Sequence, residues 1–128
     1  MDKEKLIEMA IEARKLSYSP YSRFKVGAAL LTKDNKVYKG TNIENSSYGL
    51  SMCAERNAIY NAYCNGIKKE DIVAIAIVGD TDGPCCRQVM SELLPSDAKI
   101  FLGNLKGNIL ETNNKELLPF AFNKEDLN

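Results

Sequence analysis

The chain has 128 residues and a mass of 14.2 kDa, which is the size of one domain, and we expect that domain to span residues 1–128. Lys and Arg number 17, and Asp and Glu also number 17, so the zero net charge argues against a polymeric nucleic acid or an anionic membrane as partner. No apolar run approaches the ~20 residues of a membrane span, and the charged N-terminus is unlike a signal peptide. These features predict a cytoplasmic protein.

The first half of the chain predicts a helix, a hairpin and a second helix. Asp2 is placed to cap an amphipathic helix that ends near Ser17, and its apolar face is predicted to carry Leu6, Met9, Ala10, Ala13 and Leu16. Alternating and then continuous apolar residues predict strands over 24–31 and 37–42, separated by Asp34-Asn35. A stripe of small residues predicts a helix over 53–64, ended by Asn65-Gly66, with Ala54, Ala58, Ile59 and Ala62 facing the core.

The second half begins with an apolar run over residues 72–78, which is typical of a central strand buried on both faces. We expect a short helix over 86–94, strands over 99–102 and 108–112, and a helical turn over 115–118. The order of these elements predicts an α/β fold with helices covering a mixed sheet, in which the first two strands are antiparallel.

Cysteines and a glutamate carry the chemistry that the sequence suggests. The chain has no histidine, which excludes Ser-His-Asp and Cys-His catalysis and every His-ligated metal site. Cys53 begins the second predicted helix and Cys85-Cys86 begin the third, and a helix N-terminus favours the thiolate that binds metal. Three sulfurs would leave the fourth position on Zn²⁺ to water, and Glu55 is placed to move the proton of that water.

Simpler interpretations exist for each of these residues taken alone. A cysteine is often a small buried hydrophobe, and we expect Cys64 to be one. A glutamate in the first turn of a helix is usually solvated and favoured by the helix dipole. The combination of Cys53-Ala54-Glu55 with a later Pro84-Cys85-Cys86 is what favours a catalytic zinc site.

Over nearly its whole length the chain resembles the small homotetrameric zinc-dependent cytidine deaminases. The zinc deaminase signature is His-x-Glu followed by Pro-Cys-x-x-Cys, and the small tetrameric members use Cys in place of that His. The matching segments occur in the same order in both, and in this chain they include 20–22, 24–30, 40–45, 47–48, 53–56, 86–89 and 117–119. The resemblance implies a three-layer α-β-α cytidine deaminase-like fold with a roughly five-stranded mixed sheet.

The resemblance also implies an activity and a set of roles. The activity is the hydrolytic deamination of cytidine and 2′-deoxycytidine to uridine and deoxyuridine, with release of ammonia, in pyrimidine salvage. Glu55 would be the proton shuttle, and the Zn²⁺ ligands would be Cys53, Cys85 and Cys86. Substrate would be bound by Phe24 against the ring, by Asn42 and Glu44 at the ribose hydroxyls, by the backbone around Ala54 at the base, and by Tyr48 near a neighbouring subunit's site.

Arg56 is expected to lie against the sulfurs, because three thiolates give a zinc site a formal charge of −1 that a guanidinium would offset. An ordinary surface arginine is the simpler interpretation. Without the family resemblance, Phe24 would be assigned to the core and Glu44 would be an ordinary loop charge.

One departure from the family pattern concerns the metal. The family has Pro-Cys-x-x-Cys-Arg-Gln, whereas this chain has Pro84-Cys85-Cys86-Arg87-Gln88 without the spacer. Adjacent residues diverge by ~100° in a helix, so both sulfurs reach one zinc ion only with a distorted backbone. Alternatively, one cysteine alone ligates, or the sequence lacks a short segment. A non-catalytic homologue that binds nucleosides is therefore the alternative to an active deaminase.

Overall fold

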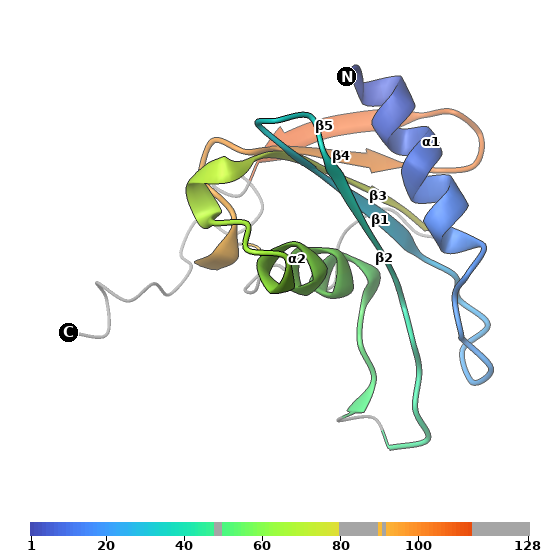
Figure 1. The fold of residues 1–128 in the computed structure, drawn as a ribbon. Helices are drawn as coiled ribbons and strands as arrows, with labels where there is room; N and C mark the ends of the chain where they lie inside the picture. Colours follow the sequence, from blue (N-terminus) through green and yellow to red (C-terminus); the bar gives the residue numbers. More distant parts are fainter. Residues whose placement is uncertain (48–49, 80–89, 91, 114–128) are drawn as a thin grey trace.

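The computed structural model describes residues 1–47, 50–79, 90 and 92–113. Two helices, α1 (Lys3–Arg14) and α2 (Ala54–Cys64), lie on opposite faces of one five-stranded sheet, as Figure 1 shows. The strands are β1 (Gly27–Thr32), β2 (Val37–Thr41), β3 (Ile72–Val78), β4 (Lys99–Gly103) and β5 (Ile109–Asn113), and the short 3₁₀ helix η2 (Lys69–Asp71) precedes β3. The predicted three-layer α-β-α fold is confirmed.

The sheet is mixed, with the strand order β2-β1-β3-β4-β5. β1 pairs antiparallel with both β2 and β3, β3 pairs parallel with β4, and β4 pairs antiparallel with β5. The predicted central strand is therefore confirmed as β3. Six of its seven residues are buried because helices cover both faces of the sheet there, and Val73 is the exception.

Helix α1 covers one face of the sheet. The Asp2 side chain accepts a hydrogen bond of 2.8 Å from the backbone N–H of Lys5, so the predicted N-cap is confirmed. Leu6, Ile7, Ala10 and Ala13 are buried in the contact with the sheet. Our prediction for Leu16 is wrong: this side chain is 76% exposed, because the helix ends at Arg14 and the chain then turns away.

Helix α2 covers the other face and begins directly after Cys53, its N-cap. The predicted stripe of Ala54, Ala58, Ile59 and Ala62 is fully buried. Our prediction that Cys64 belongs to the core is wrong, because Cys64 is an exposed free thiol. It lies two positions after Ala62, which turns it by ~200° away from the buried stripe. Gly66 follows with a φ of +84°, the left-handed conformation expected at this helix stop.

The two helices lie close to the sheet at glycines. A Cβ on Gly27 would lie 2.0 Å from the carbonyl oxygen of Ala10 in α1, and a Cβ on Gly40 would lie 2.2 Å from the backbone nitrogen of Ala58 in α2. Both contacts are to backbone atoms, which cannot move aside as a flexible side chain can. The absence of a side chain at Gly40 therefore sets how closely the N-terminal half of α2 approaches β2.

Asparagines of α2 cover the outer edge of β2. The Nδ2 atom of Asn57 donates to the carbonyl oxygen of Thr41 at 2.7 Å, and that of Asn61 donates to the carbonyl oxygen of Lys39 at 3.2 Å. These bonds satisfy acceptors that an edge strand otherwise leaves open for pairing with another chain. They also join the first turns of α2 to the end of β2, where Asn42 follows.

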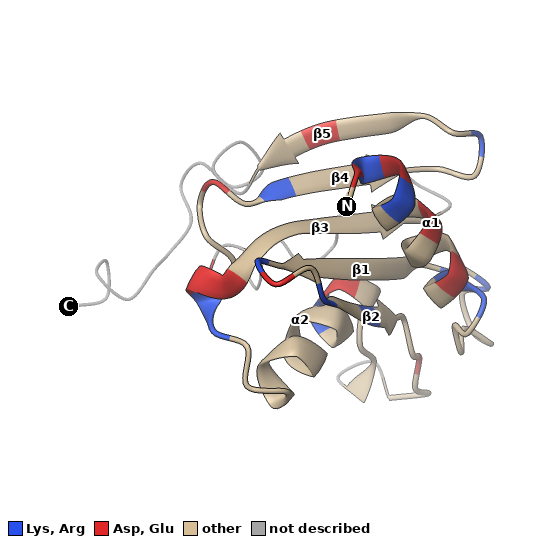
Figure 2. Ribbon diagram, turned by 45° about the horizontal axis from the view of Figure 1, so that its top comes forward, with Lys and Arg blue, Asp and Glu red and all other residues tan. Residues whose placement is uncertain are grey.

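The remaining predicted elements are only partly described. Of the helix predicted over 86–94, Met90, Glu92 and Leu93 are helical, and residues 86–89 and 91 lie outside the described residues, as does the turn predicted over 115–118. Acidic and basic residues both occur along α1 in Figure 2. No helix of the described part is long and apolar enough to cross a membrane.

Candidate active site

Two loops meet beside the N-terminus of α2. One joins α1 to β1, and the other joins β2 to α2. Ile43 and Met52 exchange two backbone hydrogen bonds of 2.9 Å across the second loop, and Tyr18 of the first loop bonds to the backbone of Asn42 and Glu44 at 3.2 and 2.8 Å. Residues far apart in the sequence are thereby fixed next to one another. Phe24, Asn42, Glu44 and the start of α2, all predicted as site residues, belong to this region.

Asn42 is half-buried, and its amide is held by the first loop. Its Oδ1 accepts hydrogen bonds from the Ser17 hydroxyl at 2.5 Å and from the backbone N–H of Val26 at 2.9 Å. Its Nδ2 donates to the carbonyl oxygen of Phe24 at 2.6 Å. An amide nitrogen carries two protons, so one N–H of Asn42 is left to donate to a ligand.

Glu44 also holds the first loop. Its Oε1 accepts from the backbone N–H groups of Tyr21 and Ser22 at 3.0 and 3.1 Å, and its Oε2 accepts from the Ser22 hydroxyl. The Ser22 hydroxyl and the two N–H groups stabilise the carboxylate, so the pKa of Glu44 lies below its usual value of 4.5. Glu44 is therefore charged at neutral pH and borders a cavity of about 260 Å³ that Tyr21, Ser22 and Ser51 also line.

The backbone of Phe24 is tied to both polar residues: its carbonyl oxygen accepts from Asn42, and its N–H donates at 3.0 Å to the Ser22 hydroxyl that bonds to Glu44. Its side chain is 37% exposed, so Phe24 does not belong to the core. An aromatic ring with a free face is what a planar base can stack against.

Cys53 and Ala54 form the start of α2. The carbonyl of Cys53 accepts the first helical hydrogen bond from Asn57 at 3.0 Å, and Cys53 itself is half-buried. Its sulfur is in a disulfide bond in this structure. Zinc binds the thiolate, so ligation through Cys53 requires the reduced form. Ala54 is fully buried and contributes only backbone to its surroundings.

Glu55 is the most unusual group of the site. It is 0% exposed, because residues 55, 58, 59 and 62 share the face of α2 that packs on the sheet. Both carboxylate oxygens are buried without a hydrogen-bond partner among the described residues. Desolvation raises the pKa of Glu55 from 4.5 to about 7, and the nearby backbone amide of Glu55 itself and the charge of Arg56 act in the opposite direction. The carboxyl group can therefore accept and release a proton near neutral pH.

Arg56 follows on the same turn and is half-buried. Its Nη2 donates to the carbonyl oxygen of Ser51 at 2.9 Å, which ties the end of the second loop to α2. Its Nε is buried without a partner among the described residues. A guanidinium with a buried, unused N–H beside Cys53 and Glu55 fits a neighbour that carries negative charge.

Three of the predicted site residues, Tyr48, Cys85 and Cys86, lie outside the described residues. Within the described part, no three cysteine or acidic side chains come together to hold a metal ion. What the structure describes fits zinc in two respects. Cys53, once reduced, would supply a soft ligand at a helix N-terminus, and Glu55 has a buried carboxylate without a donor among the described residues, which a water molecule on the metal would satisfy.

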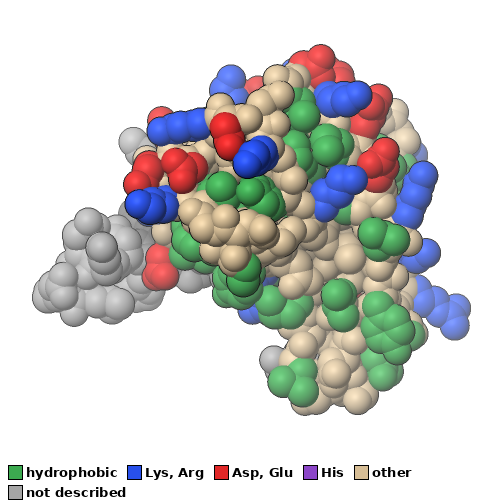
Figure 3. All heavy atoms as spheres, viewed as in Figure 1, with side chains coloured by type: hydrophobic (Ala, Val, Ile, Leu, Met, Phe, Trp, Pro, Cys, Tyr) green, Lys and Arg blue, Asp and Glu red, His purple; other side chains and the backbone are tan. Residues whose placement is uncertain are grey.

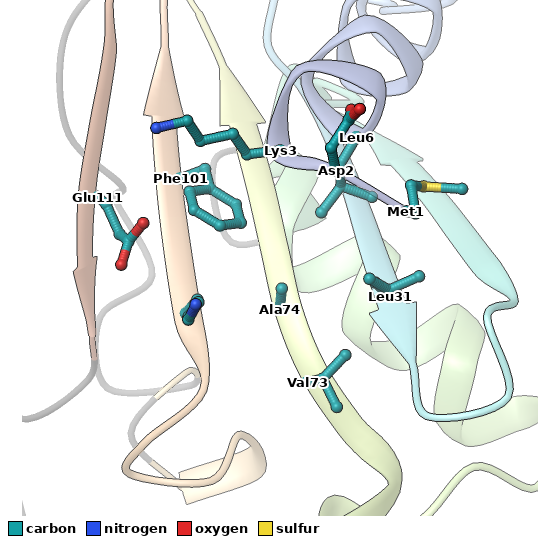
Figure 4. A pocket seen from close by; sticks show the side chains of 10 residues that line it. Met1, Asp2, Lys3, Leu6, Leu31, Val73, Ala74, Phe101 and Glu111 are labelled. Carbon is teal, nitrogen blue, oxygen red and sulfur yellow. The ribbon is translucent and has the colours of Figure 1, made fainter.

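A larger cavity, of about 410 Å³, lies on the other face of the sheet (Figure 4). It opens between the first turn of α1 and strands β3 to β5, and Leu6, Val73 and Phe101 line it together with Lys3, Lys99 and Glu111. The sheet separates it from α2. None of the predicted site residues that the structure describes borders this cavity.

The sequence analysis missed Ser17, Ser22 and Ser51 as partners of site residues. Ser17 bonds to Asn42 across 25 positions and Ser22 to Glu44 across 22 positions. Serine in a loop is common, and no local pattern marks such distant pairs. The burial of Glu55, by contrast, could have been predicted from the sequence. Its spacing from Ala58, Ile59 and Ala62 places it on the apolar face of α2.

Comparisons with known proteins agree with this geometry. Residues 1–102 match the family described as the cytidine and deoxycytidylate deaminase zinc-binding region. The cytidine deaminase of Halalkalibacterium halodurans is 56% identical over 100% of this chain and 99% of its own length, and that of Sporosarcina psychrophila is 48% identical over 99% and 96%.

The alignment with the Halalkalibacterium relative spans 133 positions although this chain has 128 residues, so at least five residues of the relative have no counterpart here. Among solved structures, the cytidine deaminase of Burkholderia pseudomallei superposes with a TM-score of 0.93 at 48% identity, covering 95% of this chain and 100% of that one. The enzyme of Mycobacterium tuberculosis gives a TM-score of 0.80 at 35% identity, covering 95% and 98%. The fold, the buried Glu55 after Cys53 and these matches together place the chain in the zinc-dependent cytidine and deoxycytidylate deaminase family.

Proposed function

We propose that this protein catalyses the hydrolytic deamination of cytidine and 2′-deoxycytidine. Water adds at C4 of the base and the C4–N4 bond breaks, which gives uridine or deoxyuridine and ammonia. Neither oxidant nor reductant is needed. The protein is then a hydrolase that acts on the carbon–nitrogen bond of a cyclic amidine, and its substrate is a neutral nucleoside rather than a charged polymer.

One observation carries this proposal: Glu55 is a fully buried carboxylate without a hydrogen-bond partner in the part of the chain that the structure describes, on the turn that Cys53 begins. Burying a carboxylate without a hydrogen bond is unfavourable, so the packing of α2 against the sheet must compensate for this cost in free energy. At that place Glu55 takes a proton from the attacking water and delivers it to the departing amino group. Zinc, when bound, lowers the pKa of a water molecule toward neutrality.

The two loops bind the nucleoside in this proposal. Phe24 offers a ring face to the base, and the backbone at Ala54 reads its edge. Asn42 donates its remaining N–H to a ribose hydroxyl, while the charged Glu44 accepts from another hydroxyl through the free lone pairs of Oε2. The bonds of Asn42 and Glu44 to the first loop support these roles, because side chains that are already oriented lose little entropy on binding.

Metal binding completes the assignment. We assign the zinc ligands to Cys53, Cys85 and Cys86, with Arg56 as the cation that offsets their charge. The unpartnered Nε of Arg56 supports its role. Tyr48 is assigned to the site of a neighbouring subunit.

A second candidate function is suggested by the residues of the relative that have no counterpart in this chain. At least five residues of the 56% identical relative are absent from this chain, and the contracted Cys85-Cys86 pair is where the family pattern is short. A homologue that binds nucleosides and holds no zinc would keep the loops and lose turnover. The two candidate functions therefore differ in zinc content and in turnover, and both keep the nucleoside-binding loops.

The test is zinc content and turnover, measured on one preparation kept reduced. About one zinc per chain with a fall in the ultraviolet absorbance of cytidine supports the deaminase. Near-zero zinc in folded protein, with nucleoside binding retained, supports the second candidate. Glu55→Gln should keep zinc and lose turnover by a factor on the order of 10³ or more. Glu8→Gln, on the exposed side of α1, is the matched control and should remain fully active.

We further infer that one domain of 128 residues assembles as a homotetramer. All described strands form one sheet. Among the described residues between 16 and 50, the exposed large apolar side chains are Leu16, Tyr18, Tyr21, Phe24, Ile43 and Leu50. Figure 3 shows apolar side chains gathered on the part of the surface that projects below the sheet.

Thiolate ligands need a reducing compartment, which supports a cytoplasmic role in pyrimidine salvage.

A further inference from the structure

The hydroxyl of Ser17 fixes which atoms of the Asn42 amide face a ligand. Ser17 follows the end of α1 and is half-buried, and its Oγ donates to Oδ1 of Asn42 at 2.5 Å. Oδ1 also accepts from the Val26 N–H at 2.9 Å. A carbonyl oxygen has two lone pairs, so both are in use. Asn42 can then only donate to a ligand.

A second hydroxyl lies behind the first. The Oγ atoms of Ser17 and Ser19 are 3.1 Å apart, and Ser19 is only 8% exposed. The Ser17 hydroxyl has one proton, and the 2.5 Å distance directs it to Oδ1 of Asn42 rather than to Ser19 at 3.1 Å or to the Asn42 carbonyl oxygen at 3.3 Å. The oxygen of Ser17 can then accept the proton of Ser19. Hydrogen bonds in such a chain strengthen one another in a shielded environment.

We propose that Ser17, supported by Ser19, is a positioning residue for sugar recognition: it locks the Asn42 amide so that an N–H, and never the carbonyl oxygen, faces the sugar hydroxyl. The proposal rests on the proposed function, because it takes Asn42 to be a sugar-binding residue. Ser17 itself does not touch the substrate. It decides the direction of a hydrogen bond and therefore which sugars are preferred.

Removal of the Ser17 hydroxyl should free a lone pair on Oδ1 and let the amide turn. One hydrogen bond of this kind is worth a factor of about three to ten in affinity. In Ser17→Ala, KM for cytidine should rise by about that factor while kcat stays within about twofold, because Glu55 is unaffected. A merely structural defect would lower kcat and the amount of active protein instead.

The deciding measurement is the affinity of the zinc-loaded protein for uridine and for 2′,3′-dideoxyuridine, which lacks both sugar hydroxyls, by titration calorimetry. We expect the preference for uridine to fall about threefold to tenfold in Ser17→Ala, to recover in Ser17→Thr, and to stay unchanged in Ser96→Ala, an exposed serine before β4. Ser19→Ala should also lower the preference for uridine, but by a smaller factor. If Ser17→Ala does not fold, the same measurement on Ser19→Ala tests the proposal.

Two results separate the possible failures. If Asn42→Ala lowers the preference for uridine and Ser17→Ala leaves it unchanged, the positioning role is overturned and the sugar-binding role of Asn42 stands. If Asn42→Ala leaves the preference unchanged, the assignment of Asn42 in the proposed function is wrong, and the inference about Ser17 is overturned together with it. In the double variant, Ser17→Ala should add nothing to Asn42→Ala.

Discussion

Gly40 of β2 lies directly against the backbone of Ala58 in α2: a Cβ at residue 40 would be 2.2 Å from the Ala58 nitrogen and 2.5 Å from the Ala54 oxygen. Ala54 and Ala58 flank Glu55 on the same helix. The position of the Glu55 carboxylate, to which we assign the proton transfer, therefore depends on a glycine in the edge strand.

Gly40→Ala should push α2 away from the sheet. We expect a loss of about 3 kcal/mol in the free energy of unfolding, measured by urea denaturation, since backbone atoms must move. Turnover of the remaining folded protein should fall on the order of 10²-fold because Glu55 is displaced. Gly66→Ala is the matched control, because a Cβ at residue 66 meets open space while the φ of +84° strains the backbone. It should lose roughly 1–2 kcal/mol of unfolding free energy and keep full turnover. Full activity in Gly40→Ala would refute the link.

Removal of zinc should abolish activity. Cys53→Ser should purify, under reducing conditions, with near-zero zinc and without turnover, because a hydroxyl is a poor zinc ligand. Cys64→Ser is a matched control, since Cys64 is an exposed free thiol at the other end of α2, and it should keep about one zinc per chain. Elemental mass spectrometry gives the metal content. Equal zinc in both variants would contradict the assignment of Cys53.

Glu44 should make stability depend on acid pH. Its pKa in the folded protein is lowered by the Ser22 hydroxyl and backbone N–H groups, so the stabilisation is fully present above the unfolded value of about 4.5. It is lost as the pH falls from there through the folded pKa. Glu44→Gln should therefore show a shallower loss of unfolding free energy below pH 4.5 than the wild type does. Parallel urea denaturation curves for the two proteins across this range would show that Glu44 is not stabilised by the loop.

Assembly should depend on the projecting loops. Leu50 is 69% exposed in the loop before α2, and a charge there would be desolvated in an interface between subunits. If the proposed homotetramer forms, Leu50→Glu should convert it to smaller species in analytical ultracentrifugation. Leu105→Glu, at a 55% exposed leucine in the turn between β4 and β5, should leave the assembly intact. A wild-type monomer, or an unchanged assembly in Leu50→Glu, would contradict the proposed interface.

Local sequence patterns predicted α1, α2 and the five strands of the described part, because each is encoded within a few neighbouring residues, whereas η2 was not predicted. The continuous apolar run of β3 predicted a buried central strand, Asp2 predicted a helix cap, and small residues at helical spacing predicted the buried face of α2. Local patterns failed where a helix ended: Leu16 and Cys64 look apolar, yet both lie where α1 and α2 no longer face the sheet. An apolar residue is buried only if the fold brings a partner to it.

Tertiary structure decided the state of the site. The Cys53-Ala54-Glu55 motif named the residues, but the burial of Glu55 and the rise of its pKa follow from α2 packing against the sheet across Gly40. The hydrogen bonds that hold Asn42 and the lowered pKa of Glu44 involve Ser17 and Ser22, which are 25 and 22 positions away. Such contacts exist only after two loops have been folded together, since hydrogen-bond partners and desolvation are properties of the space around a residue and not of its neighbours in the chain.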